Sequence, residues 1–183
     1  MSQADSTSLY RLAMTVEVLV LSGSMGSGKT TVMAEASDIL IAGGVAHAAL
    51  DLDALGIVHL RRRKTDDLAR RNLAAVWRNY AKAGVRKLLL AEALESVERR
   101  DHLRQAIPSS HIVVCRLRAP LDVMRKRVRA RERGLRQAEF VKRVAELEAT
   151  LDFGHVDDFE VDNGDRPVTT VAREVLRRAG WIQ

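Results

Sequence analysis

The sequence predicts an α/β fold in which helices cover both faces of a five-stranded parallel sheet. Short apolar runs that suit buried strands alternate along the chain with longer segments of helical periodicity, and this alternation is typical of a parallel sheet. No repeat, low-complexity tract or linker divides the sequence, so a single domain is expected. The predicted strands are residues 16–21, 45–50, 86–91, 111–117 and 157–161.

Glycine and proline residues mark the ends of the predicted helices. Gly43 and Gly44 stop the first helix, Gly84 stops the second, and Pro167 lies in the first turn of the last. The predicted helices are residues 28–42, 65–83, 96–106, 120–132, 137–150 and 167–180. Residues 1–15 are expected to form a loose tail, and residues 16–183 the domain.

The composition indicates which kinds of partner the protein binds and in which cellular compartment it works. The net charge of +6 favours an anionic partner. Only 4% of the residues are aromatic, which argues against a stacking surface for nucleic acid, and nucleotide phosphates account for the charge equally well. No run approaches the roughly 20 apolar residues that cross a bilayer, and a single cysteine, Cys115, allows no internal disulfide. We therefore expect a cytoplasmic protein without membrane contact, either a monomer or a homodimer.

A phosphate-binding motif lies between the first predicted strand and the first predicted helix. Residues 23–30 read Gly-Ser-Met-Gly-Ser-Gly-Lys-Thr and fit the Walker A pattern G-x-x-x-x-G-K-[ST]. Its glycines let successive N–H groups converge on phosphate, and the helix points its positive end at the same anion. Lys29 is placed to reach the β- and γ-phosphates, and the Thr30 hydroxyl to reach magnesium. The predicted nucleotide contacts are Gly23, Ser24, Met25, Gly26, Ser27, Gly28, Lys29, Thr30 and Thr31.

Beyond this motif, the chain from about Val16 onward resembles the nucleoside-monophosphate-kinase-like P-loop kinases. The resemblance rests on the short length, on Asp51-Leu-Asp53 after the second strand, and on a basic helix followed by Arg-Glu-Arg-Gly. That group includes shikimate, gluconate and adenylylsulfate kinases and chloramphenicol phosphotransferase. It implies a P-loop NTPase three-layer sandwich with a small lid. It also implies an enzyme that uses ATP and Mg²⁺ to transfer the γ-phosphate to a hydroxyl or phosphate of a small-molecule acceptor.

Acidic residues after the second strand are the candidates for acceptor and metal binding. The resemblance implies that one of them contacts the acceptor hydroxyl and that a neighbour steadies magnesium. An extended chain would place Asp51 and Asp53 on the same side, at the carboxyl end of the sheet. We assign Asp53 to the acceptor and Asp51, with Thr30, to the metal. Glu92, at the end of the apolar run 88–92, is an alternative metal residue.

The basic stretch 125–133 occupies the place where such kinases carry a lid. The resemblance implies that Arg127 stacks on adenine and that Arg131 or Arg133 closes over the transferring phosphoryl group. Gly134 interrupts the helices and predicts a mobile lid at about residues 131–138. With Lys29 and Asp53, Arg131 completes the predicted catalytic set, whereas a solvated helix face is the alternative for several of these arginines.

The sequence does not identify the acceptor. Residues 61–64 (Arg-Arg-Arg-Lys) and 70–72 (Arg-Arg-Asn) either hold an anionic acceptor or are surface charge, and Gly56 stands where adenylylsulfate kinases have an arginine. Residues 53–56 also match the D-x-x-G pattern of GTP-dependent switch proteins, but the chain lacks an N-K-x-D sequence for guanine. A nucleic-acid end kinase is a third reading, prompted by the charge, although no appended binding domain supports it.

Overall fold

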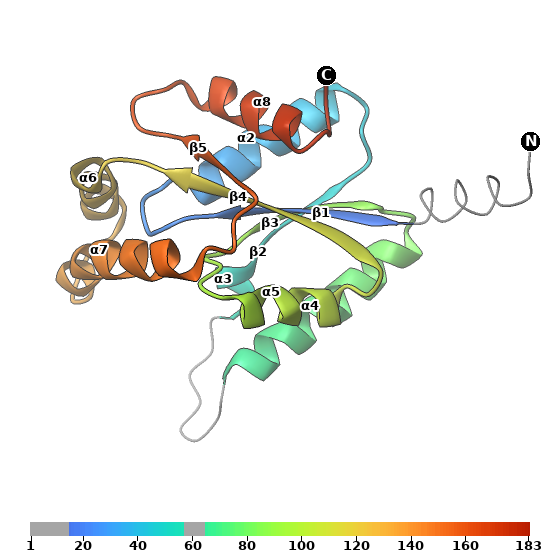
Figure 1. Ribbon diagram of the computed structural model, residues 1–183, viewed down its shortest axis with the longest axis horizontal. Helices are drawn as coiled ribbons and strands as arrows, with labels where there is room; N and C mark the ends of the chain where they lie inside the picture. The colour runs from blue at the N-terminus through green and yellow to red at the C-terminus, as the bar shows by residue number, and fades with distance from the viewer. Residues whose placement is uncertain (1–14, 57–64) are drawn as a thin grey trace, which may run out of the picture.

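The sheet consists of five parallel strands, as predicted, and the structure shows their order to be β2-β3-β1-β4-β5. Figure 1 shows the computed structural model, which describes residues 15–56 and 65–183. Nearly all of the predicted tail therefore lies outside the described residues. The strands are β1 (Val16–Ser22), β2 (Ala48–Asp51), β3 (Lys87–Ala91), β4 (Ser110–Arg118) and β5 (Phe159–Asp162).

Helices cover both faces of this sheet, which gives three layers (Figure 1). On one face lie α2 (Lys29–Ala42) and α8 (Val168–Arg178), and on the other α4 (Thr65–Lys82) and α5 (Val97–Ala106). The α6 (Leu121–Arg131) and α7 (Gln137–Gly154) helices pack against each other beyond the end of the sheet, and α3 (Leu52–Leu55) is a single turn. Within the described ranges, no helix combines the length and the apolar character that crossing a membrane requires.

The alternation of side chains along β1 explains why both faces are covered. Leu19 and Leu21 point into the core beneath α2 and α8, whereas Val18 and Val20 point into the core beneath α4 and α5. All four side chains are buried, and each such burial contributes about 1.5–3 kcal/mol. A strand that is apolar on both sides requires helices on both sides. Cys115 is buried in the first of these cores, where desolvation raises the pKa of its thiol.

The segment around β2 differs from the sequence prediction in two ways. The strand begins at Ala48 rather than at residue 45, because the N–H of Val45 bonds the carbonyl of Leu40 and so helps to close α2. The extended geometry predicted for residues 51–53 is wrong, because α3 begins at Leu52. Asp51 is the N-cap of α3, and its carboxylate accepts the N–H of Asp53 at 3.0 Å.

A buried ion-pair cluster attaches α7 to β4. The guanidinium of Arg116 is only 2% exposed, and it donates to the Glu148 carboxylate at 2.8 Å and lies 2.9 Å from that of Asp152. Arg118 pairs with Asp152 at 3.0 Å and with Glu160 at 2.8 Å. Partial desolvation of Asp152 works in the opposite direction, but the two arginines lower the pKa of this carboxyl overall. Asp152 therefore keeps its charge, and the ion pairs of the cluster hold α7 against β4.

We predict that Glu148→Ala lowers the free energy of unfolding by about 3 kcal/mol, because it removes one partner of a buried charge while Asp152 still compensates in part. Glu146→Ala is the matched control, since Glu146 lies on the same helix with 59% of its side chain exposed. Chemical denaturation monitored by circular dichroism measures both variants. Equal stabilities of the two variants would contradict the structural role of the cluster.

Candidate active site

In the loop between β1 and α2, the backbone comes close to other segments of the chain at two positions, and both positions require glycine. Gly26 and Gly28 have φ angles of 80° and 97°, a region that disfavours other residues. A Cβ on Gly26 would collide with the carbonyl of Met124, and one on Gly28 with the side-chain amide of Asn163. The Walker A glycines therefore serve both the turn itself and its contacts with distant segments.

The start of α2 presents positive charge to the space above the loop. Its N-cap, Gly28, has no side chain to bond the first N–H groups, which lack intrahelical acceptors. The Nζ of Lys29 donates to the carbonyls of Gly23 at 2.9 Å and Ser24 at 3.3 Å, so this side chain curls over the loop. Desolvation lowers the pKa of Lys29, while the carboxylates of Asp53 and Asp51 act in the opposite direction. An anion bound here would stabilise the charged form of Lys29.

Thr30 and Asp51 form an oxygen-rich pair beside the loop. The Thr30 hydroxyl donates to Asp51 Oδ2 at 2.9 Å, and the other carboxylate oxygen accepts the N–H of Asp53. Hydroxyl and carboxylate oxygens are the ligands that Mg²⁺ prefers, so these residues fit the predicted metal site. Asp51 and Asp53 do lie together, but the turn of α3 rather than an extended strand brings them there.

Arg127 and Asn163 connect the loop to two other parts of the chain. The guanidinium of Arg127 donates to the carbonyls of Gly26 at 3.3 Å, Asn163 at 2.9 Å and Gly164 at 2.6 Å. The amide of Asn163 donates to the carbonyl of Ser27 at 2.7 Å. These bonds tie the loop to α6 and to the segment between β5 and α8. The predicted adenine residue thus also supports the phosphate loop.

A cavity of about 840 Å³ opens above the loop and gathers most of the predicted site residues. Those that line it are Met25, Gly26, Gly28, Lys29, Thr30, Thr31, Asp51, Asp53, Arg127 and Arg131. Gly23, Ser24 and Ser27 do not line it and are buried. Arg133 is exposed and is not among the lining residues.

One face of α7 adds residues that the sequence reasoning missed. Phe140, Arg143 and Leu147 line the cavity, and their spacing of three and four residues is that of one helical face. The Ser24 hydroxyl donates to the carbonyl of Val144 at 2.8 Å, which brings this face to the loop. The spacing was visible in the sequence, but nothing local indicated that this face meets the loop.

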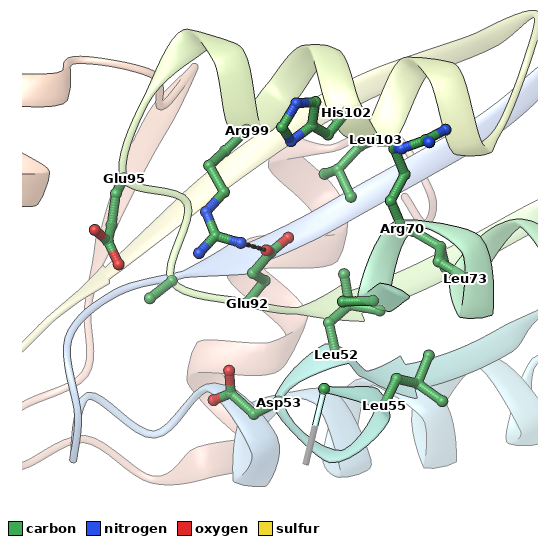
Figure 2. Close-up of a pocket in the computed structure, with 13 residues that line it drawn as sticks. Leu52, Asp53, Leu55, Arg70, Leu73, Glu92, Glu95, Arg99, His102 and Leu103 are labelled. Atoms are coloured by element: carbon green, nitrogen blue, oxygen red, sulfur yellow. Dashed lines mark ion pairs between the residues drawn. The ribbon is translucent and has the colours of Figure 1, made fainter. Parts of the chain in front are cut away.

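A second, smaller cavity of about 270 Å³ adjoins the first. Asp53, Ala93 and Glu95 line both, so they lie at the junction. Figure 2 shows the smaller cavity, with Asp53 and Glu95 at one end and four leucines at the other, where Arg70 and His102 also lie. Glu95, which sequence reasoning also missed, lies in the loop between β3 and α5.

The structure also shows where Glu92, the alternative metal residue, and the basic segment 70–72 lie relative to the two cavities. Glu92 lines the smaller cavity, where it pairs with Arg99 at 3.5 Å, and does not line the larger one. Arg70 lines the smaller cavity, whereas Asn72 donates to the carbonyl of Leu55 and so supports α3. Residues 61–64 lie outside the described residues.

Comparisons with known proteins identify the fold. Neither the protein-family models nor the curated proteins give a match. A sugar kinase from a Janibacter species matches with a TM-score of 0.61 at 22% identity, over 89% of this chain and 93% of that one. A gluconokinase from Sinorhizobium meliloti gives 0.57 at 21% identity, over 90% and 91%. The shikimate kinase from Acinetobacter baumannii, in complex with shikimate, gives 0.56 at 15% identity, over 90% and 93%. The chain therefore has the fold of small-molecule P-loop kinases, and the predicted three-layer sandwich is confirmed.

We predict that Arg127→Lys loosens the segment between β5 and α8, because an ammonium group cannot reproduce the guanidinium's simultaneous bonds to three carbonyls. Amide hydrogen exchange of residues 162–166 should accelerate several-fold. Arg129→Lys is the control, since Arg129 is exposed on the same helix. If both variants exchange like the wild type, Arg127 does not hold this segment.

Proposed function

We propose that the protein is an ATP-dependent kinase that transfers the γ-phosphate to a small-molecule acceptor. One observation carries the proposal: Asp53 lies at the junction of a large cavity above the Walker A loop and a small one beside it. A phosphoryl donor and an acceptor bound in the two cavities would meet at this carboxylate. The kinase fold of the structural neighbours supports the same reading.

The larger cavity suits the phosphates of a nucleotide. The positive end of α2 and the side chains of Lys29, Arg131 and Arg143 surround it, and such preorganised cations stabilise the charge of a transferring phosphoryl group. The bonds of Arg127 to main-chain carbonyls lie in the guanidinium plane, which leaves a face for the adenine ring.

Thr30 and Asp51 would hold a magnesium ion. When bound, Mg²⁺ would supply positive charge to the β- and γ-phosphates. Asp51 suits this role better than Glu92, because it is bonded to Thr30 beside the phosphate loop, whereas Glu92 pairs with Arg99 in the smaller cavity.

Asp53 would act on the acceptor. In the transfer, the acceptor hydroxyl oxygen forms a bond to Pγ, and the bond between Pγ and the bridging oxygen of ADP breaks. The hydroxyl proton passes to the carboxylate of Asp53 and then to water. The products are a phosphate monoester and ADP.

The lid at residues 131–138 would close on the donor. Gly134 has a φ of 93°, and Arg131 pairs with the neighbouring Glu132 at 2.9 Å while 61% of its side chain is exposed. An exposed pair of this kind contributes about 0–1 kcal/mol, so phosphate competes easily for the arginine. Closure would bring Arg131 to the γ-phosphate and exclude water.

We predict that Lys29→Ala weakens ATP binding by about 10- to 100-fold, because the phosphates lose charge-assisted hydrogen bonds. Titration calorimetry with a non-hydrolysable ATP analogue and Mg²⁺ measures the affinity. Lys142→Ala is the control, since this lysine is 81% exposed on α7. Wild-type affinity in the Lys29 variant would refute the phosphate site.

We predict that Asp53→Asn lowers kcat by roughly 10²-fold or more, because the amide cannot accept the acceptor proton. Affinity for ATP should stay nearly unchanged, and Asp38→Asn, at an exposed position on α2, should alter neither. Steady-state kinetics and nucleotide titration separate the two effects. An equal loss of ATP affinity would assign Asp53 to the metal instead.

The class of reaction is tested with labelled nucleotides and a panel of acceptors. ATP with Mg²⁺ should phosphorylate a small hydroxyl-bearing metabolite or antibiotic. Hydrolysis specific for GTP without transfer would indicate a switch protein, and transfer to the end of an oligonucleotide would indicate a nucleic-acid kinase.

A further inference from the structure

We propose that the smaller cavity selects an alcohol with an apolar body and no anionic group. This inference rests on the proposed kinase function and narrows its acceptor. The side chains that line the cavity fall into two groups, leucines at one end and carboxylates at the other, and each group restricts the acceptor in a different way.

The leucine end requires an apolar partner. Leu52, Leu55, Leu73 and Leu103 come from α3, α4 and α5 and face one another across the cavity (Figure 2). Leu73 and Leu103 are almost completely buried, at 2% and 4% exposure. A polyol would place hydroxyl groups against these side chains, where they lose hydrogen bonds to water without gaining partners. An aromatic or branched aliphatic body would instead displace water from an apolar wall.

The carboxylate end disfavours an anionic acceptor. Asp53, Glu92 and Glu95 oppose Arg70 and Arg99, so the lining in the described residues carries a net charge of −1 with His102 neutral. Arg99 already lies 3.5 Å from the Glu92 carboxylate. A phosphate monoester brings a further charge of about −1.5 to −2, which the net negative charge of this lining repels. The same repulsion, though weaker, opposes a carboxylate.

The placement of the two ends sets the orientation of the acceptor. Asp53 and Glu95 lie at the junction with the larger cavity, and the leucines lie away from it (Figure 2). An alcohol that buries its apolar body among the leucines therefore points its hydroxyl toward the phosphoryl donor. The cavity volume of about 270 Å³ is at the small end for ligand sites, which suits a single ring with a short hydroxylated chain.

A matched acceptor panel tests the proposal on the full-length protein with Mg²⁺ and ATP. The probes are 1-phenyl-1,2-ethanediol, erythritol, gluconate and AMP. ADP release measured by a coupled assay, with the product identified by mass spectrometry, should give a kcat/KM for the phenyl diol at least about tenfold above each of the others. Preference for erythritol, gluconate or AMP would overturn the proposal and leave the kinase function intact.

Calorimetry on the ADP-bound protein gives a second readout that does not depend on turnover. The phenyl diol should bind and erythritol should not, and failure of the diol to bind overturns the inference. The proposed function itself fails in a different way, with neither ATP binding nor transfer to any member of the panel.

Substitution of a leucine tests the apolar wall directly. Leu55→Asn should raise KM for the phenyl diol about tenfold or more and leave the affinity for ATP unchanged, because Leu55 lines only the smaller of the two cavities. Ile41→Asn is the control for an apolar-to-polar change, since Ile41 is 66% exposed at the end of α2. A Leu55 variant with wild-type KM for the diol would contradict the assignment.

Discussion

The first turn of α2 leaves N–H groups without acceptors, and much of the molecule is arranged around that local excess of positive charge. The parallel sheet places the end of β1 between β3 and β4, so the phosphate loop opens where the carboxyl ends of the strands meet. Gly28 caps the helix without a side chain, which keeps the N–H groups accessible. Asn163 and Arg127 hold the loop from the outside by bonding its carbonyls, so the N–H groups remain directed at the cavity.

The position of α7 depends on a second electrostatic arrangement. Burying Arg116 would be costly without partners, and Glu148 and Asp152 supply them from two successive turns of α7. Together with the bond from Ser24 to Val144, this places Arg143 at the rim of the cavity. The position of Arg143 in the lining of the larger cavity therefore relies on ion pairs that lie outside the cavity.

The two cavities differ in the kinds of side chain that line them. Four cationic side chains and four carboxylates line the larger one beside the positive end of α2, whereas four leucines line the smaller together with three carboxylates and two arginines. An anionic donor and a neutral acceptor would each find the more favourable environment on opposite sides of Asp53.

The sequence by itself determined the features that depend only on residues close together along the chain. The Walker A loop, the five strands and the succession of helices follow from glycine positions and from apolar periodicity, which act locally. The site was only partly predictable. Asp53 lies beside Asp51 at the larger cavity, but the predicted extended geometry is wrong, since Asp51 caps a turn that the short segment did not reveal. Arg143, Glu95 and the bonds of Arg127 and Asn163 to the loop were decided by tertiary structure, because each depends on contacts between segments far apart in the chain, up to 136 residues for Asn163 and Ser27.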